Sequence, residues 1–350
     1  MTTTATRSGG RTHRPAWTGL LIVAALLLSV VGAVLVGSAG LSPQLVVTSI
    51  AGHLGLPVTM PPPLIDSVIW ELRLPRTLMA GVVGAALAIC GCVLQAITGN
   101  PLADPYLLGV SSGASTGAVL VFVLGMGGGA VSMSAGAFAG AVLSLALVFA
   151  LLGRGFTSSS RIVLIGVVVG QLFAALTSLV VTAAGDADAA RGILYWLLGS
   201  MSTARWDSLA VVALVTAVAG VAFWTRSLTL DGLAFGGETA AGLGIDIDRV
   251  RRRMVMVTAL SVAAVVAAVG AIGFVGLIVP HAVRMLGLTA HRSLLAGSAV
   301  VGAVFLIWAD AVARSALDSE IPVGVVTALI GVPAFLMIMR RREQTGAGAS

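Results

Sequence analysis

The amino-acid sequence predicts an all-α polytopic membrane protein with about ten transmembrane helices and both termini in the cytoplasm. Of its 350 residues, 58% are apolar and only 10% are charged, which leaves too little polar surface to cover one or two soluble domains. Apolar runs of about 20 residues, long enough to cross a bilayer as helices, recur from one end of the chain to the other. The sequence lacks the alternating segments of about 10 residues that are typical of outer-membrane barrels.

Glycines, prolines and charged residues divide the apolar runs into ten candidate spans. These spans cover about residues 17–38, 75–98, 105–125, 129–152, 162–184, 208–225, 254–270, 273–288, 294–316 and 322–339. The scheme treats residues 1–16 and 342–350 as cytoplasmic tails and 17–341 as one transmembrane domain, and it assigns no helix to residues 39–74.

The first span, "WTGLLIVAALLLSVVGAVLVG", follows an arginine-containing tail and so resembles a secretory signal peptide. Its apolar stretch exceeds the usual 7–15 residues of the apolar region of a signal peptide, so we interpret it as a retained span.

The second span contains both cysteines of the chain, Cys90 and Cys92. Two positions apart on a helix they point to different faces, so we interpret them as small apolar residues and not as a redox pair or metal ligands.

Turn signals separate the next spans: "GNPLADP" (99–105) contains Asn-Pro and Asp-Pro steps, and "GMGGG" (125–129) is a glycine hinge. Glycines at four-residue spacing give some spans a face of small residues, which lets helices approach closely in lipid and predicts a compact bundle. These glycines are Gly109, Gly113 and Gly117 in the third span and Gly166 and Gly170 in the fifth.

No charge interrupts the chain between Met254 and Pro280, so the seventh and eighth spans could also be one long helix. The arginines decide between these schemes. Ten spans place fifteen of the twenty arginines inside, whereas a merged helix would move "RRR" (340–342) outside, against the positive-inside bias. The five arginines expected on the outer side are Arg73, Arg76, Arg191, Arg205 and Arg314.

Carriers coupled to ions or protons usually place carboxylates or histidines within the membrane. Here nearly all acidic residues lie in loops. Asp310 is the exception; it lies four residues before Arg314, and a local ion pair is favoured over a proton relay.

Lysine is absent, so a G-x-x-x-x-G-K-[ST] phosphate-binding loop cannot exist. The arginines lie next to apolar runs, which indicates membrane topology and not nucleic-acid binding. The chain is therefore expected to be driven from outside itself.

Five segments resemble the FecCD-type permeases, the membrane subunits of type II ABC importers for ferric siderophores, haem and cobalamin. They are "RLPRTLMAGVVGAALAICGCVLQAITGNPLADPYLLGVSSGA", "YWLLGSM", "GETAAGLGI", "GFVGLIVPHAVR" and "ADAVARSALDSEIPVGVVTALIGVPAF". The resemblance runs in order over about residues 17–341. It implies a ten-helix permease domain in the cell (inner or cytoplasmic) membrane, paired with an identical or paralogous protomer around a central path. It also implies two cytoplasmic ATPase subunits and an extracellular or periplasmic solute-binding protein.

By similarity to this family, Arg73 and Arg76 of "RLPR" and Arg314 of "ADAVAR" form the outer docking surface for two carboxylates of the binding protein. The alternative is that these arginines only anchor span ends to lipid headgroups. A short amphipathic piece, "GILYWLLGSM" (192–201), is expected beside the outer gate.

On the inner side, "DGLAFGGETAAGLGIDIDRVRRR" (231–253) is the longest cytoplasmic loop, and its residues alone indicate a linker that ends in a basic stop signal. In the family, the segment similar to "GETAAGLGI" forms short helices that insert into a cleft on the ATPase. The coupling residues implied within a loop at 231–248 are Glu238, Thr239, Ala241, Leu243 and Gly244.

The family pattern also implies a cytoplasmic gate, formed by the turn after the second span and the start of the fifth. Those positions are Asn100, Leu102, Ser159 and Ser160. For Asn100, turn chemistry ahead of a proline is an alternative that does not exclude the gate.

The function expected from the resemblance is import of ferric siderophores, with cobalamin or haem as alternative cargo. An ion-coupled secondary transporter is the alternative from another class. The chain is not expected to be an enzyme or to hold a cofactor, because ATP and Mg²⁺ belong to the partner ATPase. His281 and His291 lack a ligand cluster of the usual spacing, so no metal site is expected.

Overall fold

The computed structural model describes residues 16–36, 41–125, 132–153, 155–184, 187–317 and 319–347, and all regular secondary structure within these ranges is helical. Ten helices correspond one by one to the ten predicted spans. They are α1 (Ala16–Leu35), α4 (Leu74–Thr98), α5 (Val110–Val123), α6 (Met133–Leu152), α7 (Ser159–Ala184), α9 (Trp206–Thr225), α12 (Ile247–Val269), α13 (Val275–Met285), α14 (His291–Ser315) and α15 (Val323–Ala347).

Among the described helices, six are long and apolar enough to cross a membrane by length and composition, and α1, α5, α13 and α15 contain shorter apolar stretches. Ten crossings, an even number, would return the chain to the side on which α1 begins. The predicted tail at 1–15 lies outside the described residues, and residues 342–347, predicted as tail, continue α15.

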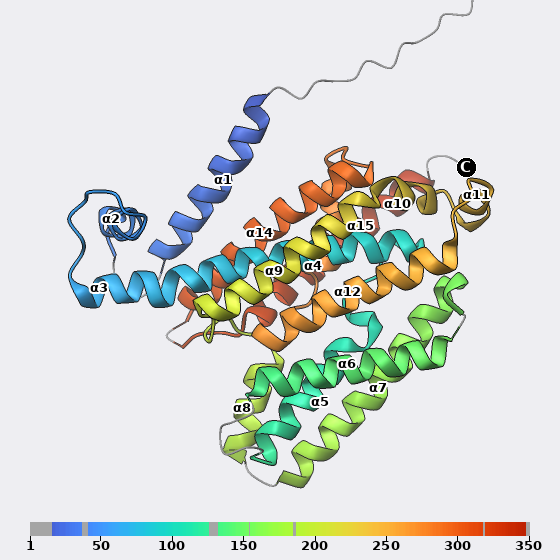
Figure 1. Ribbon diagram of the computed structural model, residues 1–350, viewed down its shortest axis with the longest axis horizontal. Coiled ribbons are helices and arrows are strands. Elements are labelled where there is room, and N and C mark those ends of the chain that lie inside the picture. Colours follow the sequence, from blue (N-terminus) through green and yellow to red (C-terminus); the bar gives the residue numbers. More distant parts are fainter. Residues whose placement is uncertain are drawn as a thin grey trace, which may run out of the picture.

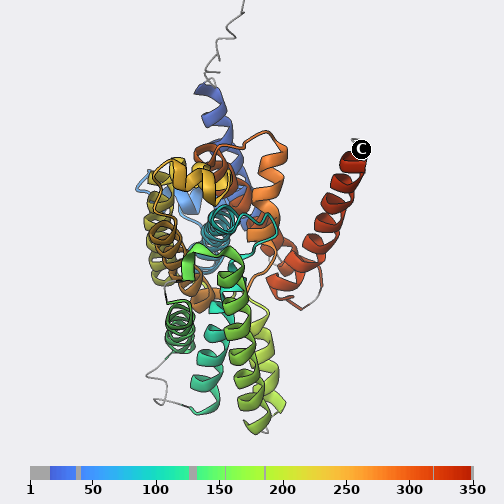
Figure 2. The same cartoon turned by 90° about the vertical axis from the view of Figure 1, so that its right-hand side faces the viewer.

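Helix α4 is the centre of the bundle (Figure 1). Every residue from Ala86 to Thr98 is buried, and the helix contacts α9, α12, α13 and α14. Helices α5, α6 and α7 pack on one another as a second group, which α12 joins to α4 (Figures 1 and 2). Where α4 crosses α13, a Cβ placed on Gly91 would collide with the backbone of Gly276, so both helices depend on glycine for this approach.

The predicted glycine faces are helix contacts, as expected. A Cβ on Gly113 of α5 would lie 2.6 Å from the carbonyl oxygen of Gly140 in α6. A Cβ on Gly109 would lie 2.7 Å from the carbonyl oxygen of Gly166 in α7. Small residues therefore set the close packing of α5 between its two neighbours.

The structure confirms that the seventh and eighth spans are separate. Helix α12 ends at Val269 and α13 begins at Val275, with an irregular segment between them. Gly270 has φ +75° and Phe274 has φ +70°, both in the left-handed region that a continuing α-helix does not use.

Residues 39–74, to which the prediction assigned no helix, contain two. Helix α2 (Pro43–His53) is separate, whereas helix α3 (Pro63–Ser67) continues through the π-helical turn η1 (Val68–Arg73) into α4. The helical segment of the second span therefore begins at Pro63. The ring of His53 stacks on Trp70 with centroids 4.0 Å apart. Such packing between distant residues stabilises helices too short and too polar to be recognised from an apolar run.

Three further short helices lie in the connections. Helix α8 (Ala187–Leu197) overlaps the predicted amphipathic piece. Helix α10 (Ser227–Ala234) overlaps the start of the predicted coupling loop at 231–248, and α11 (Gly237–Gly242) lies within it. In Figure 1, α2 and α3 lie at the left-hand end of the bundle, and α10 and α11 at the right-hand end. We refer to these as the outer and inner ends, following the predicted topology.

Candidate functional site

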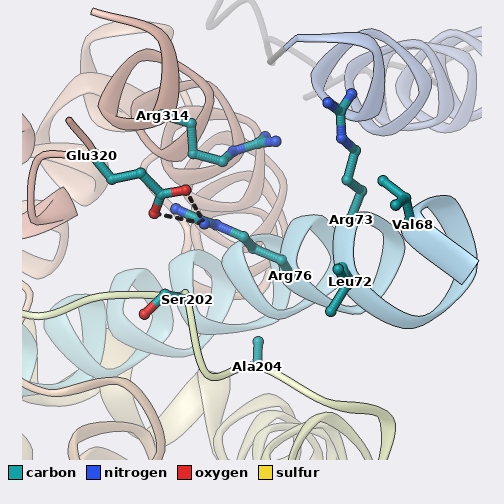
Figure 3. Close-up of a pocket in the computed structure, with 8 residues that line it drawn as sticks. All are labelled: Val68, Leu72, Arg73, Arg76, Ser202, Ala204, Arg314 and Glu320. Atoms are coloured by element: carbon teal, nitrogen blue, oxygen red, sulfur yellow. Dashed lines mark hydrogen bonds and ion pairs between the residues drawn. The ribbon is translucent and has the colours of Figure 1, made fainter. Parts of the chain in front are cut away.

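The three arginines predicted to dock a partner lie together at the outer end (Figure 3). Arg73 ends the π-helical turn, Arg76 lies in the first turn of α4, and Arg314 lies in the last turn of α14. They share a cavity of about 330 Å³, called here the outer cup. Its lining residues are Val68, Leu72, Arg73, Arg76, Ser202, Ala204, Arg314 and Glu320.

Two carboxylates neutralise part of this charge. The predicted ion pair within α14 is present, because Arg314 Nε lies 3.0 Å from Asp310 Oδ2. Asp310 also binds Arg76, with Arg76 Nη2 3.1 Å from Asp310 Oδ1, although the two residues are 234 positions apart. Arg76 Nη1 lies 2.9 Å from Glu320 Oε2 on the loop before α15. The sequence interpretation included neither contact of Arg76.

Arg73 and Arg314 bind the end of α1. Arg73 Nη1 donates to the carbonyl oxygen of Val34 at 2.8 Å. Arg314 donates to the carbonyl oxygens of Ala33 and Val36, each at 3.1 Å. The last carbonyls of a helix have no partner within it and carry partial negative charge, so guanidinium groups are favourable there. These arginines therefore also join α1 to α4 and α14.

Three arginines and two carboxylates leave the outer cup with one net positive charge. The side chains of Arg76 and Arg314 are only 12% and 7% exposed, so the cup presents guanidinium groups that are already oriented. A concave cationic surface of this kind suits carboxylates on a protein partner. That these three arginines dock a partner stays a prediction, as does the alternative of headgroup anchoring.

At the inner end, three of the four predicted gate residues line one cavity of about 480 Å³: Asn100, Ser159 and Ser160. The fourth, Leu102, is 41% exposed, and its backbone N–H donates to Asn100 Oδ1 at 2.9 Å. This contact is the turn chemistry considered for Asn100, and it coexists with the position of Asn100 in the cavity.

The predicted coupling residues lie on and directly after α11. All five are exposed: Glu238, Thr239, Ala241, Leu243 and Gly244. Between them Ala240 is fully buried and holds the short helix against the bundle. The arrangement therefore presents one surface at the inner end, in agreement with short helices instead of a plain linker.

An unpredicted contact anchors this region to α14. Asp231 of α10 accepts from the backbone N–H of His291 at 2.9 Å and lies 2.7 Å from its Nδ1. Arg284 donates to Gln95 Oε1 at 2.6 Å, close to the same end of α4. The helices α4 and α14 thus connect the outer cup with the inner anchors. Sequence spacing provides no signal for these pairs, because each joins residues more than 50 positions apart.

The fold and site define a multi-pass helical membrane protein with a cationic cup at one end and exposed short helices at the other. The profile of the FecCD transport family matches residues 21–341, and the chain belongs to this family. It is therefore a membrane permease subunit of a type II ABC importer, as expected, and not an ion-coupled secondary transporter. Importers of this type work with ATPase and binding-protein partners.

Curated relatives and solved structures agree with this assignment. A cobalamin import system permease protein from Halobacterium salinarum is 40% identical over 277 residues, which are 79% of this chain and 74% of that protein. A vitamin B12 import system permease protein from Salmonella typhi is 41% identical over 276 residues, covering 77% of this chain and 83% of that protein. An inward-facing structure described as a candidate metal-chelate type ABC transporter matches with a TM-score of 0.80 and 33% identity, covering 92% of this chain and 98% of that chain.

Proposed function

We propose that this chain is the permease subunit of a cobalamin importer. The observation that supports this cargo is the naming of relatives about 40% identical over more than three-quarters of the chain as cobalamin or vitamin B12 permeases. The siderophore cargo expected from the sequence is the second candidate. It is favoured by the similarity to a candidate metal-chelate transporter, since a ferric siderophore is also a metal chelate.

In this proposal a solute-binding protein outside the cell or in the periplasm docks on the outer cup. Arg73, Arg76 and Arg314 receive carboxylates on its two lobes. Charge pairs at such a rim set register and association rate more than affinity, and each exposed pair contributes about 0.2–1 kcal/mol. Specificity for the cargo then resides mainly in the binding protein.

At the inner end, the surface around Glu238 and Leu243 inserts into a partner ATPase, two copies of which bind ATP and Mg²⁺. Their movement reaches the bundle through α10, because Asp231 is bonded to the first residue of α14. The permease, paired with a second identical or paralogous protomer in the cell membrane, then alternates between outward-open and inward-open states.

The gate proposed for the cytoplasmic side consists of Asn100 and Leu102 from the turn after α4, with Ser159 and Ser160 from the start of α7. The cavity that Asn100 shares with both serines supports this assignment, because it places polar groups from two separate elements around one opening. Hydroxyl and amide groups bind a polar cargo weakly, as release requires.

The test is uptake of labelled cobalamin and labelled ferric siderophore in cells that express the complete importer or lack only this gene. Loss of cobalamin uptake alone on deletion, restored by the intact gene, supports the proposal. Loss of siderophore uptake alone would show that the cargo is a ferric siderophore, the second candidate. Uptake that continues when the partner ATPase is inactivated would contradict an ATP-driven importer.

A further inference from the structure

Every nitrogen of the Arg76 guanidinium group already has a carboxylate partner. Arg76 Nε lies 3.1 and 3.3 Å from the two oxygens of Asp310, and Arg76 Nη2 lies 3.1 Å from Asp310 Oδ1. Arg76 Nη1 donates to both oxygens of Glu320, at 3.1 and 2.9 Å (Figure 3). Arg76 binds a carboxylate best through two nitrogens at once, and Asp310 and Glu320 already occupy these positions, so a docking carboxylate can form such a pair only by replacing one of the two acids.

The two acids differ in their accessibility. Asp310 is 1% exposed and is also bound by Arg314, so it lies beneath the arginines. Glu320 has a side chain that is 44% exposed, and it lies on the wall of the outer cup itself. A half-exposed pair is weak because water competes for both ions, whereas a buried pair that shares two cations is strong. Glu320 is therefore the acid that an incoming carboxylate can replace.

We propose that Glu320 is an internal substitute for the partner's carboxylate, which occupies Arg76 in the free permease and is displaced when the binding protein docks. This inference rests on the proposed docking function of the outer cup. In this role Glu320 competes with the partner's carboxylate for Arg76 and lowers the affinity for the binding protein. The complex therefore dissociates more easily after each transport cycle.

Displacement of Glu320 also acts on α15. Glu320 is three residues before the start of that helix, and the first turn of α15 packs tightly on two outer connections. A Cβ on Gly324 would collide with the carbonyl oxygen of Leu198 after α8, and would lie 3.1 Å from that of Ala271 between α12 and α13. The pair between Arg76 and Glu320 thus restrains a helix end that contacts both the amphipathic outer piece and the break after α12.

The experiment measures binding of the solute-binding protein to the complete importer, with its ATPase subunits, in lipid nanodiscs. Glu320→Gln keeps the size of the side chain and removes its charge, so we expect the Kd to fall about two- to fivefold, the range that one exposed ion pair permits. The salt dependence of binding should become steeper, because one more positive charge faces the partner. Thermal unfolding of each variant shows that the protein is folded.

The matched control is Glu71→Gln, which removes the same charge from an exposed acid on the turn that also contains Arg73. We expect its Kd to change less than that of Glu320→Gln, and equal tightening would show a general charge effect and overturn the inference. Arg76→Gln tests the docking function separately. If Arg76→Gln weakens binding and Glu320→Gln leaves it unchanged or weakens it, docking stands and the substitute role of Glu320 fails. If Arg76→Gln has no effect, the proposed docking function itself fails.

Discussion

Replacement of Asp310 by Asn should destabilise the permease strongly, because one buried carboxylate neutralises two arginines. The side chain of Asp310 is 1% exposed, and it lies 3.1 Å from Arg76 Nη2 and 3.0 Å from Arg314 Nε. Both arginines are themselves mostly buried, so the variant would leave two like charges close together, with only the half-exposed Glu320 to offset them. Removal of one partner from a buried ion pair costs about 3–5 kcal/mol.

Asn keeps one oxygen that can accept a hydrogen bond, so we expect a loss near the lower limit, about 3 kcal/mol. The entropy of unfolding scales with chain length, so for 350 residues each kcal/mol lowers the Tm by about 1.4 °C, and the Tm should fall by about 4 °C. The assay is thermal unfolding in detergent, followed by intrinsic tryptophan fluorescence and checked by size-exclusion chromatography.

The control for this prediction is Asp207→Asn, which neutralises an exposed acid in the first turn of α9 and should change the Tm little. A double variant with Arg76→Gln and Asp310→Asn should lose less stability than the sum of the single losses, since Arg76→Gln removes one of the cations that Asp310→Asn leaves uncompensated. A Tm for Asp310→Asn within about 1 °C of the unmodified protein would refute this account of the network.

Three further predictions concern packing, anchoring and coupling. Gly91→Ala should lower the Tm by forcing α4 away from α13, whereas Gly242→Ala, where a Cβ meets no atom within 4 Å, should not; equal Tm values would contradict the contact. Asp231→Asn should weaken the anchor to His291 and lower the stimulation of ATPase activity by the binding protein, while basal activity remains; full stimulation would exclude the anchor from coupling. Leu243 is 67% exposed, so Leu243→Arg should leave the Tm unchanged. The added charge should reduce co-purification of the ATPase subunits, and normal co-purification would show that Leu243 does not lie on the coupling surface.

The elements predicted correctly from the sequence depend on local signals. Ten apolar runs correspond to ten helices, and the arginine distribution correctly separated α12 from α13. The glycine faces of α5 and the ion pair between Asp310 and Arg314 follow from spacings of about one helical turn. Helix α2 was missed because a helix of 11 residues that depends on packing has no apolar run of its own.

The sequence alone determined the class of protein, the number of its spans and the family, and it predicted the direction of the spans and the candidate docking, gate and coupling residues. Each of these follows from run length, charge asymmetry or motifs that neighbouring residues define. Only the tertiary structure decided what the arginines bind: Arg76 bonds to Glu320 across 244 positions, and Arg314 to the end of α1 across more than 270. A guanidinium group can pair with any carboxylate or carbonyl that comes within about 3 Å, and the packing of α4, α14 and α1 determines which ones do.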